Sequence, residues 1–157
     1  MALSAGTVLG EPRQLRPAAE RAPLPSLEGK FRTTLRVKSG GKPFGQSRGD
    51  KVTRTWSFKE RCGKVSPCDR VKLMRKGKSG RFGSILRRGS DGSSWSGVEK
   101  VRGRCGDGLR FSSKARIAVK ANELRGDDVT EITGTFDARV KGCLKGGESA
   151  VLRGDLR

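Results

Sequence analysis

Residues 31–38 read Phe-Arg-Thr-Thr-Leu-Arg-Val-Lys, and this stretch decides the fold class. Its odd-numbered positions carry Phe, Thr, Leu and Val, whereas its even-numbered positions carry Arg, Thr, Arg and Lys. A repeat of two residues is the pattern of a β-strand with one face in a core and the other in solvent. Glycine and proline in residues 39–43 then end the strand.

Similar patterns predict strands at residues 51–58, 70–75, 81–88, 95–105, 129–140 and 150–152, although the alternation is poor at 95–105. Arg54 interrupts the apolar face of the strand predicted at residues 51–58, and the sequence offers no reason for it. Residues 111–121 fit both a strand and a helix, but the β-branched Ile117 and Val119 favour a strand. About eight short segments separated by turn signals are typical of an all-β fold, either a small antiparallel barrel or a sandwich.

The first 29 residues differ from the rest. They hold four of the six prolines, and their three arginines balance their three glutamates. We therefore interpret residues 1–29 as a flexible tail or linker and residues 30–157 as one basic all-β domain that carries the whole net charge of +19.

Hydrophobic residues make up 32% of the chain and aromatic residues only 5%, which leaves a thin core. The four cysteines therefore predict stabilising disulfide bonds. Four cysteines allow three pairings, and we favour Cys62–Cys68 across a turn and Cys105–Cys143 between distant segments. Free thiols and a zinc site are the alternatives. Zinc favours two-residue spacers or histidine, whereas the first spacer here has five residues and histidine is absent.

The charge balance of 35 Lys and Arg against 16 Asp and Glu predicts attraction to polyanions. Nucleic acid, anionic lipid headgroups and phosphate-rich wall polymers all fit this charge. A solvated face that keeps the domain soluble is the alternative. The predicted polyanion patch lies in the hairpin of residues 70–88 and consists of Arg70, Lys72, Arg75, Lys76, Lys78, Arg81, Arg87 and Arg88.

No motif predicts catalysis, a cofactor or a metal. The absence of histidine excludes a conventional Ser-His-Asp triad. Gly77-Lys78-Ser79 resembles the end of a phosphate-binding loop but lacks the earlier glycine. Arg-Gly-Asp occurs three times, and glycine with aspartate is ordinary turn chemistry. We therefore expect a non-enzyme.

Residues 51–58, Lys-Val-Thr-Arg-Thr-Trp-Ser-Phe, lead into a close cysteine pair, and two cysteines follow at wide spacing. Over residues 30–152 this pattern resembles uncharacterised exported domains of high-GC Gram-positive bacteria. The resemblance implies an extracytoplasmic β-domain and no activity. Residues 1–10 lack the basic and apolar segments of a signal peptide, so this localisation requires an export signal upstream, and a cytoplasmic location is the alternative.

Three functions therefore remain open. The first is a non-catalytic exported domain that contacts an anionic component of the cell envelope. The second is a nucleic-acid-binding protein of the cytoplasm. The third is a carrier barrel with a cavity for a small ligand.

Overall fold

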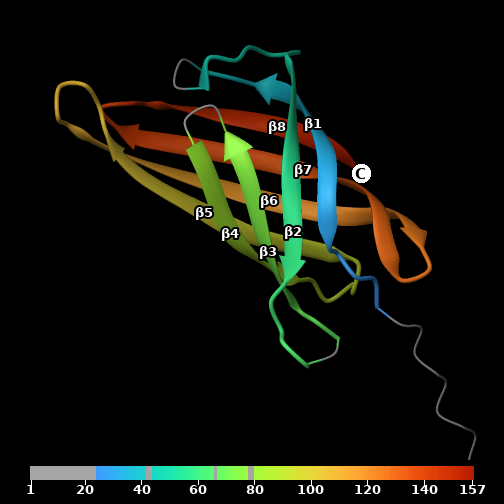
Figure 1. The fold of residues 1–157 in the computed structure, drawn as a ribbon. Helices are drawn as coiled ribbons and strands as arrows, with labels where there is room; N and C mark the ends of the chain where they lie inside the picture. Colours follow the sequence, from blue (N-terminus) through green and yellow to red (C-terminus); the bar gives the residue numbers. More distant parts are fainter. Residues whose placement is uncertain (1–23, 42–43, 66, 78–79) are drawn as a thin grey trace, which may run out of the picture.

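The structure, a computed structural model, describes residues 24–41, 44–65, 67–77 and 80–157. Eight strands account for most of these residues (Figure 1). They are β1 (Gly29–Ser39), β2 (Lys51–Glu60), β3 (Arg70–Gly77), β4 (Gly80–Arg88), β5 (Ser94–Arg104), β6 (Arg110–Arg125), β7 (Asp128–Gly142) and β8 (Gly146–Leu156).

The strands form one closed antiparallel barrel in which each strand pairs with its neighbours in sequence and β8 pairs with β1. The all-β prediction is confirmed, and the fold is the barrel rather than the sandwich. Residues 111–121 lie within β6, so the strand interpretation of that segment is correct. Several strands are longer than predicted; for example, β6 has 16 residues and β7 has 15.

The barrel is not uniform around its circumference. β5 and β6 pair from Ser94 to Arg104, whereas β4 and β5 share only the register pairs Arg87–Ser96 and Arg88–Trp95. Because β4 and β5 separate beyond these pairs, the barrel is narrow and filled at one end and wide at the other. Strands β5 to β8 extend past the other strands at the wide end, as Figure 1 shows.

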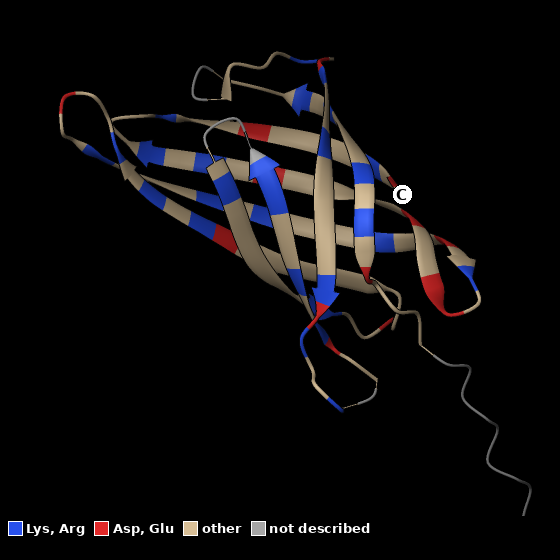
Figure 2. Ribbon diagram, viewed as in Figure 1, with Lys and Arg blue, Asp and Glu red and all other residues tan. Residues whose placement is uncertain are grey.

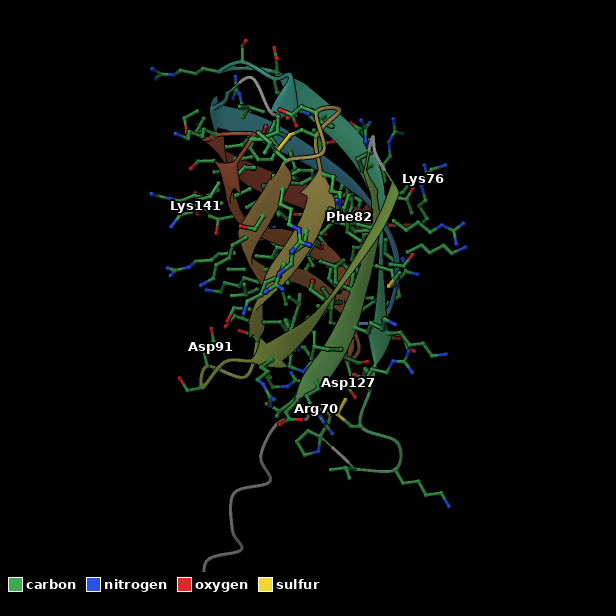
Figure 3. All side chains as sticks on the ribbon, turned by 90° about the vertical axis from the view of Figure 1, so that its left-hand side faces the viewer. Arg70, Lys76, Phe82, Asp91, Asp127 and Lys141 are labelled. Atoms are coloured by element: carbon green, nitrogen blue, oxygen red, sulfur yellow. A yellow bond between two sulfur atoms is a disulfide. The ribbon has the colours of Figure 1, made fainter. Side chains whose placement is uncertain are left out.

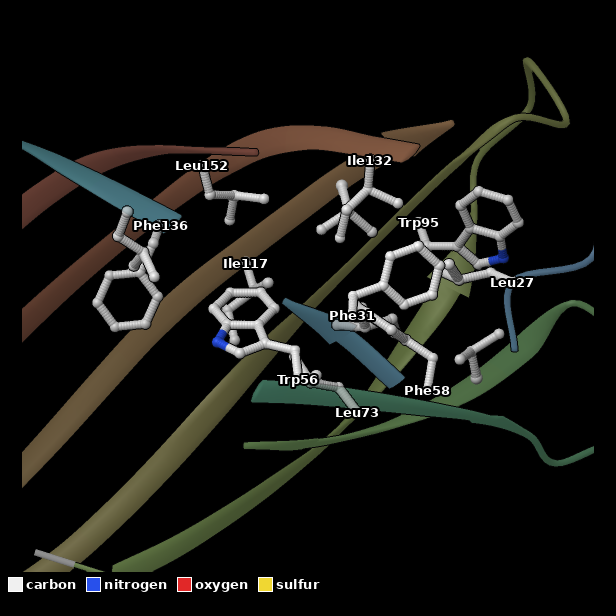
Figure 4. Packing of buried hydrophobic residues seen from close by; sticks show 14 of the residues in the cluster. Leu27, Phe31, Trp56, Phe58, Leu73, Trp95, Ile117, Ile132, Phe136 and Leu152 are labelled. Atoms are coloured by element: carbon white, nitrogen blue, oxygen red, sulfur yellow. The ribbon is translucent and has the colours of Figure 1, made fainter. Parts of the chain in front are cut away.

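Inward-facing apolar side chains fill the narrow end, and the cluster continues to Trp56 and Phe136 toward the wide end (Figure 4). The rings of Phe31 and Phe58 meet edge to face with centroids 5.4 Å apart. Leu27 is fully buried, and the neighbouring Ser26 forms an isolated bridge with Asp128. Residues 26–28 therefore belong to the barrel's packing, although the sequence placed them in the tail, while residues 1–23 of that tail lie outside the described residues.

Arg88 holds the narrow end together. Its Nε and Nη2 donate to the Cys68 carbonyl at 3.0 and 2.8 Å, and its Nη1 donates to the carbonyls of Pro25 and Gly92 at 2.8 and 2.6 Å. Its guanidinium carbon lies 4.8 Å from the ring centroid of Trp95. One side chain thus joins the N-terminal segment, the loop between β2 and β3, and the turn between β4 and β5.

Both preferred cysteine pairings are confirmed. Cys62 and Cys68 are joined within the loop after β2, and Cys105 and Cys143 join the β5–β6 turn to the segment after β7. The two bridges lie at opposite ends of the barrel, because β2 and β4 end where β5 and β7 begin. Within the described residues, no helix has the length and apolar character that crossing a bilayer requires.

Candidate functional site

The wide end of the barrel contains a cavity of about 540 Å³. All eight strands contribute to its wall, together with Phe44 and Gln46 from the loop after β1 and Leu144 from the turn after β7. The cavity lies at the end opposite Arg88, where β4 and β5 diverge. Its position therefore follows from the uneven pairing of the barrel.

Aromatic side chains are concentrated around this cavity. The sequence has six phenylalanines and two tryptophans, and five of these eight residues line the cavity wall. They are Phe44, Trp56, Phe82, Phe111 and Phe136. Such a wall packs against apolar and aromatic ligands, because rings offer a large contact area at a small cost in conformational entropy.

A buried ion pair crosses the cavity between β3 and β5. Arg75 Nε donates to Glu99 Oε2 at 3.2 Å, and Arg75 Nη2 donates to Glu99 Oε1. The Glu99 side chain is only 2% exposed and the Arg75 side chain 18%. The Arg75 guanidinium carbon also lies 4.8 Å from the ring centroid of Phe82 and 5.1 Å from that of Phe136, so the cation lies close to two aromatic rings.

Arg75 retains donors for a ligand. A guanidinium has five N–H donors, and the hydrogen bonds to Glu99 use only two of them. No further hydrogen bond from Arg75 forms within the described part of the chain. The remaining donors lie in a wall that is otherwise largely apolar, which is the usual arrangement by which a binding site orients a ligand.

Glu148 of β8 adds a second buried carboxyl group to the wall. With its amide nitrogen directed at Glu148, Gln46 donates to both carboxylate oxygens at 2.8 and 3.0 Å. Burial raises the pKa of Glu148, and the positive charge of Arg75 opposes this shift in part. Glu148 is therefore protonated more readily than an exposed glutamate, and in that state it donates a hydrogen bond as well as accepting one.

Basic side chains mark the rim of the cavity. Arg54 occupies an inward-facing position of β2 but lies near the open end, where its side chain is exposed and donates to the Thr53 carbonyl at 3.0 Å. Its position at the rim explains why a charge interrupts the apolar face of this strand. Lys76 and Arg102 also line the rim.

The structure does not bring the predicted polyanion patch together as one surface. Arg75 lies in the cavity, Arg88 closes the narrow end, and Lys78 lies outside the described residues. The remaining members occupy outward-facing positions of β3 and β4, and Figure 3 labels two of them, Arg70 and Lys76. These members are Arg70, Lys72, Lys76, Arg81 and Arg87.

The sequence analysis missed Glu99 and Glu148 as site residues, although a signal for both was present. Each occupies a position that alternation assigns to the buried face, because Glu99 is four residues after the buried Trp95 and Glu148 is two before the buried Ala150. A charged residue on the apolar face of a strand needs a partner or a function. Comparison of the chain with protein-family models, curated proteins and solved structures finds no match.

Proposed function

We propose that this protein binds a small amphipathic molecule in the cavity at the wide end of its barrel. One observation carries the proposal, namely that an open cavity with five aromatic side chains in its wall contains Arg75 and the buried carboxyl groups of Glu99 and Glu148. A volume of about 540 Å³ lies within the range of roughly 300–1,000 Å³ that is usual for small-ligand sites.

The chemistry of the wall indicates the class of ligand. A ring or a short hydrocarbon body can pack against wall residues such as Trp56 and Phe111, because Arg75 already lies beside Phe82 and Phe136. A hydrogen-bond acceptor on the ligand would meet the unused donors of Arg75, and Glu148 offers a second polar contact beside it. A ligand without such a group would bury the unused N–H donors of Arg75 without giving them an acceptor, so it would bind more weakly.

Two disulfides support an oxidising compartment, and we propose an extracytoplasmic location for this binding activity. The resemblance to exported bacterial domains stays a prediction that points the same way. Four free thiols in the protein as isolated from cells, without added reductant, would contradict this location.

Filling the cavity tests the proposal. Ala115 of β6 is buried and lines the cavity, so the substitution Ala115→Trp places an indole in the space that the ligand would occupy. We expect wild-type protein to bind the neutral fluorescent probe N-phenyl-1-naphthylamine saturably, and Ala115→Trp to weaken this binding at least about tenfold, the effect of about 1.4 kcal/mol. A neutral probe is chosen because it does not bind simply to the basic surface.

The control is Ala118→Trp on the same strand. Ala118 faces outward and is exposed, so this variant adds the same indole without entering the cavity. It should bind the probe as wild-type protein does, and thermal unfolding should show both variants folded. Saturable binding that both substitutions reduce equally, or that neither reduces, would place the probe elsewhere and contradict the proposal.

A further inference from the structure

A second feature lies on the outer face of the strands that extend past the wide end. In register across β5, β6 and β7, Lys100 lies beside Lys114, which lies beside Arg139. The next row toward the wide end holds Arg102, Ser112 and Lys141, and the row on the other side holds Val98, Arg116 and Asp137. Figure 2 shows blue segments recurring along these strands. We call the exposed cations of these rows the basic face: Lys100, Arg102, Arg104, Arg110, Lys114, Arg116, Arg139 and Lys141.

Within the described residues, no member of the basic face forms an ion pair. Asp137, beside Arg116 in the register, is the one acidic residue in the rows, and it accepts a hydrogen bond from the Ser149 hydroxyl. Like charges directly opposite one another on neighbouring strands repel. An anion that binds across the rows would relieve this repulsion, so this face favours anion binding.

The face is also hollowed. A groove of about 930 Å³ runs over β5 to β8, with basic side chains such as Lys114 and Lys141 along it and Ser112 and Ser149 between them. Gly146 and Gly147 contribute no side chain to the groove at the start of β8. Figure 3 shows basic side chains projecting outward on the side of Lys141. Asp137 and Glu148 also line the groove, but its cations outnumber these two carboxyl groups. Cations and hydroxyl groups are the groups that hold phosphates.

We propose that the basic face binds a linear phosphodiester polymer without bases, of the kind that bacterial envelopes contain. Same-face residues recur about every 6.8 Å along a strand, and neighbouring strands lie about 4.8 Å apart, so the face presents a regular array of cations. A regular array suits a chain of regularly repeated phosphates. The outward residues that border it, Ser96, Val98, Ala118 and Thr135, include no aromatic ring on which bases could stack.

Substitutions in the central row of Lys100, Lys114 and Arg139 test this proposal most directly. The triple variant Lys100→Gln, Lys114→Gln and Arg139→Gln removes three neighbouring charges and leaves the inward-facing cavity residues unchanged. With poly(glycerol phosphate) as the probe, we expect affinity at about 0.1 M salt to fall on the order of 100-fold, because three phosphate contacts contribute about 0.7 log units each for a single chain. The slope of log affinity against log salt should become shallower by about 2.

The matched control removes the same three charges from β2, β3 and β4. Lys59 and Lys72 lie opposite each other in the register, and Arg87 lies on the next strand, so Lys59→Gln, Lys72→Gln and Arg87→Gln lower the net charge equally. This control should lose less than about threefold in affinity, because its charges lie outside the groove.

Three outcomes would overturn the proposal: equal losses in both triple variants, binding that does not depend on salt, and tighter binding of single-stranded oligothymidylate of the same charge. The last outcome would identify nucleic acid as the partner. Binding of the neutral probe in the cavity is a separate readout that neither triple variant should alter, so failure here and failure of the proposed cavity function are distinguishable.

Discussion

The substitution Arg75→Met should lower the free energy of unfolding by about 3 kcal/mol. Methionine retains much of the packing between Phe82 and Phe136 but removes the positive charge that Glu99 requires. Glu99 is then left as a carboxylate at 2% exposure without its ion-pair partner, which is one of the costliest arrangements in a protein interior. Chemical denaturation at neutral pH measures this loss of unfolding free energy, provided that the denaturant dependence (the m-value) equals that of wild-type protein.

A second substitution distinguishes the effect of the unpaired Glu99 carboxylate from the effect of lost packing around Arg75. Adding Glu99→Leu to Arg75→Met removes the stranded carboxylate, so the double variant should regain most of the loss and lie within about 1 kcal/mol of wild-type protein. A double variant that is no more stable than Arg75→Met would mean that the guanidinium contributes through its packing on the rings. An unchanged stability of Arg75→Met would mean that the ion pair is not buried as described.

Removal of the bridge between Cys105 and Cys143 should destabilise the barrel more than removal of the bridge between Cys62 and Cys68. The two cysteine pairs are separated by 38 and 6 residues. Restricting the longer loop in the unfolded chain contributes about 4 kcal/mol, against about 2 kcal/mol for the shorter one, on the loop-entropy account. Thermal unfolding of the two double Cys→Ser variants gives the comparison.

Both variants replace two thiols with two hydroxyls, so each is the control for the other. The same order should appear in denaturant, and reduction of the wild-type protein should cost at least as much as the larger single loss. Equal losses from the two bridges would show that native-state packing near each bridge, and not the loop length, sets its contribution.

Local sequence patterns predicted the strands well because alternation is a local property. The eight residues from Phe31 to Lys38 show their two faces directly, and β1 places them as predicted. The helix alternative for residues 111–121 failed because β-branched residues at positions 117 and 119 pack on the pleated surface of a sheet. The choice between barrel and sandwich depended on whether β8 pairs with β1, which no local pattern records.

The sites were less predictable because they depend on strand register. Arg75 and Arg88 are basic residues in a basic hairpin, and only the barrel's closure shows that one enters the cavity and the other caps the opposite end. The basic face is assembled from β5, β6 and β7. Lys100 and Arg139 are 39 positions apart in the chain, yet both lie beside Lys114 in the sheet. A charge-rich stretch of sequence was therefore a poor guide to a charge-rich surface.

The central claim, that the wide end of the barrel binds a small amphipathic ligand, is tested most directly with the two tryptophans. Trp56 lines the cavity, whereas Trp95 lies at the narrow end, where its indole nitrogen has no hydrogen-bond partner within the described residues. Replacing either residue with Phe leaves one tryptophan as a reporter for a brominated neutral ligand such as bromocyclohexane, which quenches indole fluorescence on contact. The account predicts saturable quenching in Trp95→Phe, which retains Trp56, and none in Trp56→Phe; equal quenching in both variants, or quenching of Trp95 alone, would contradict it.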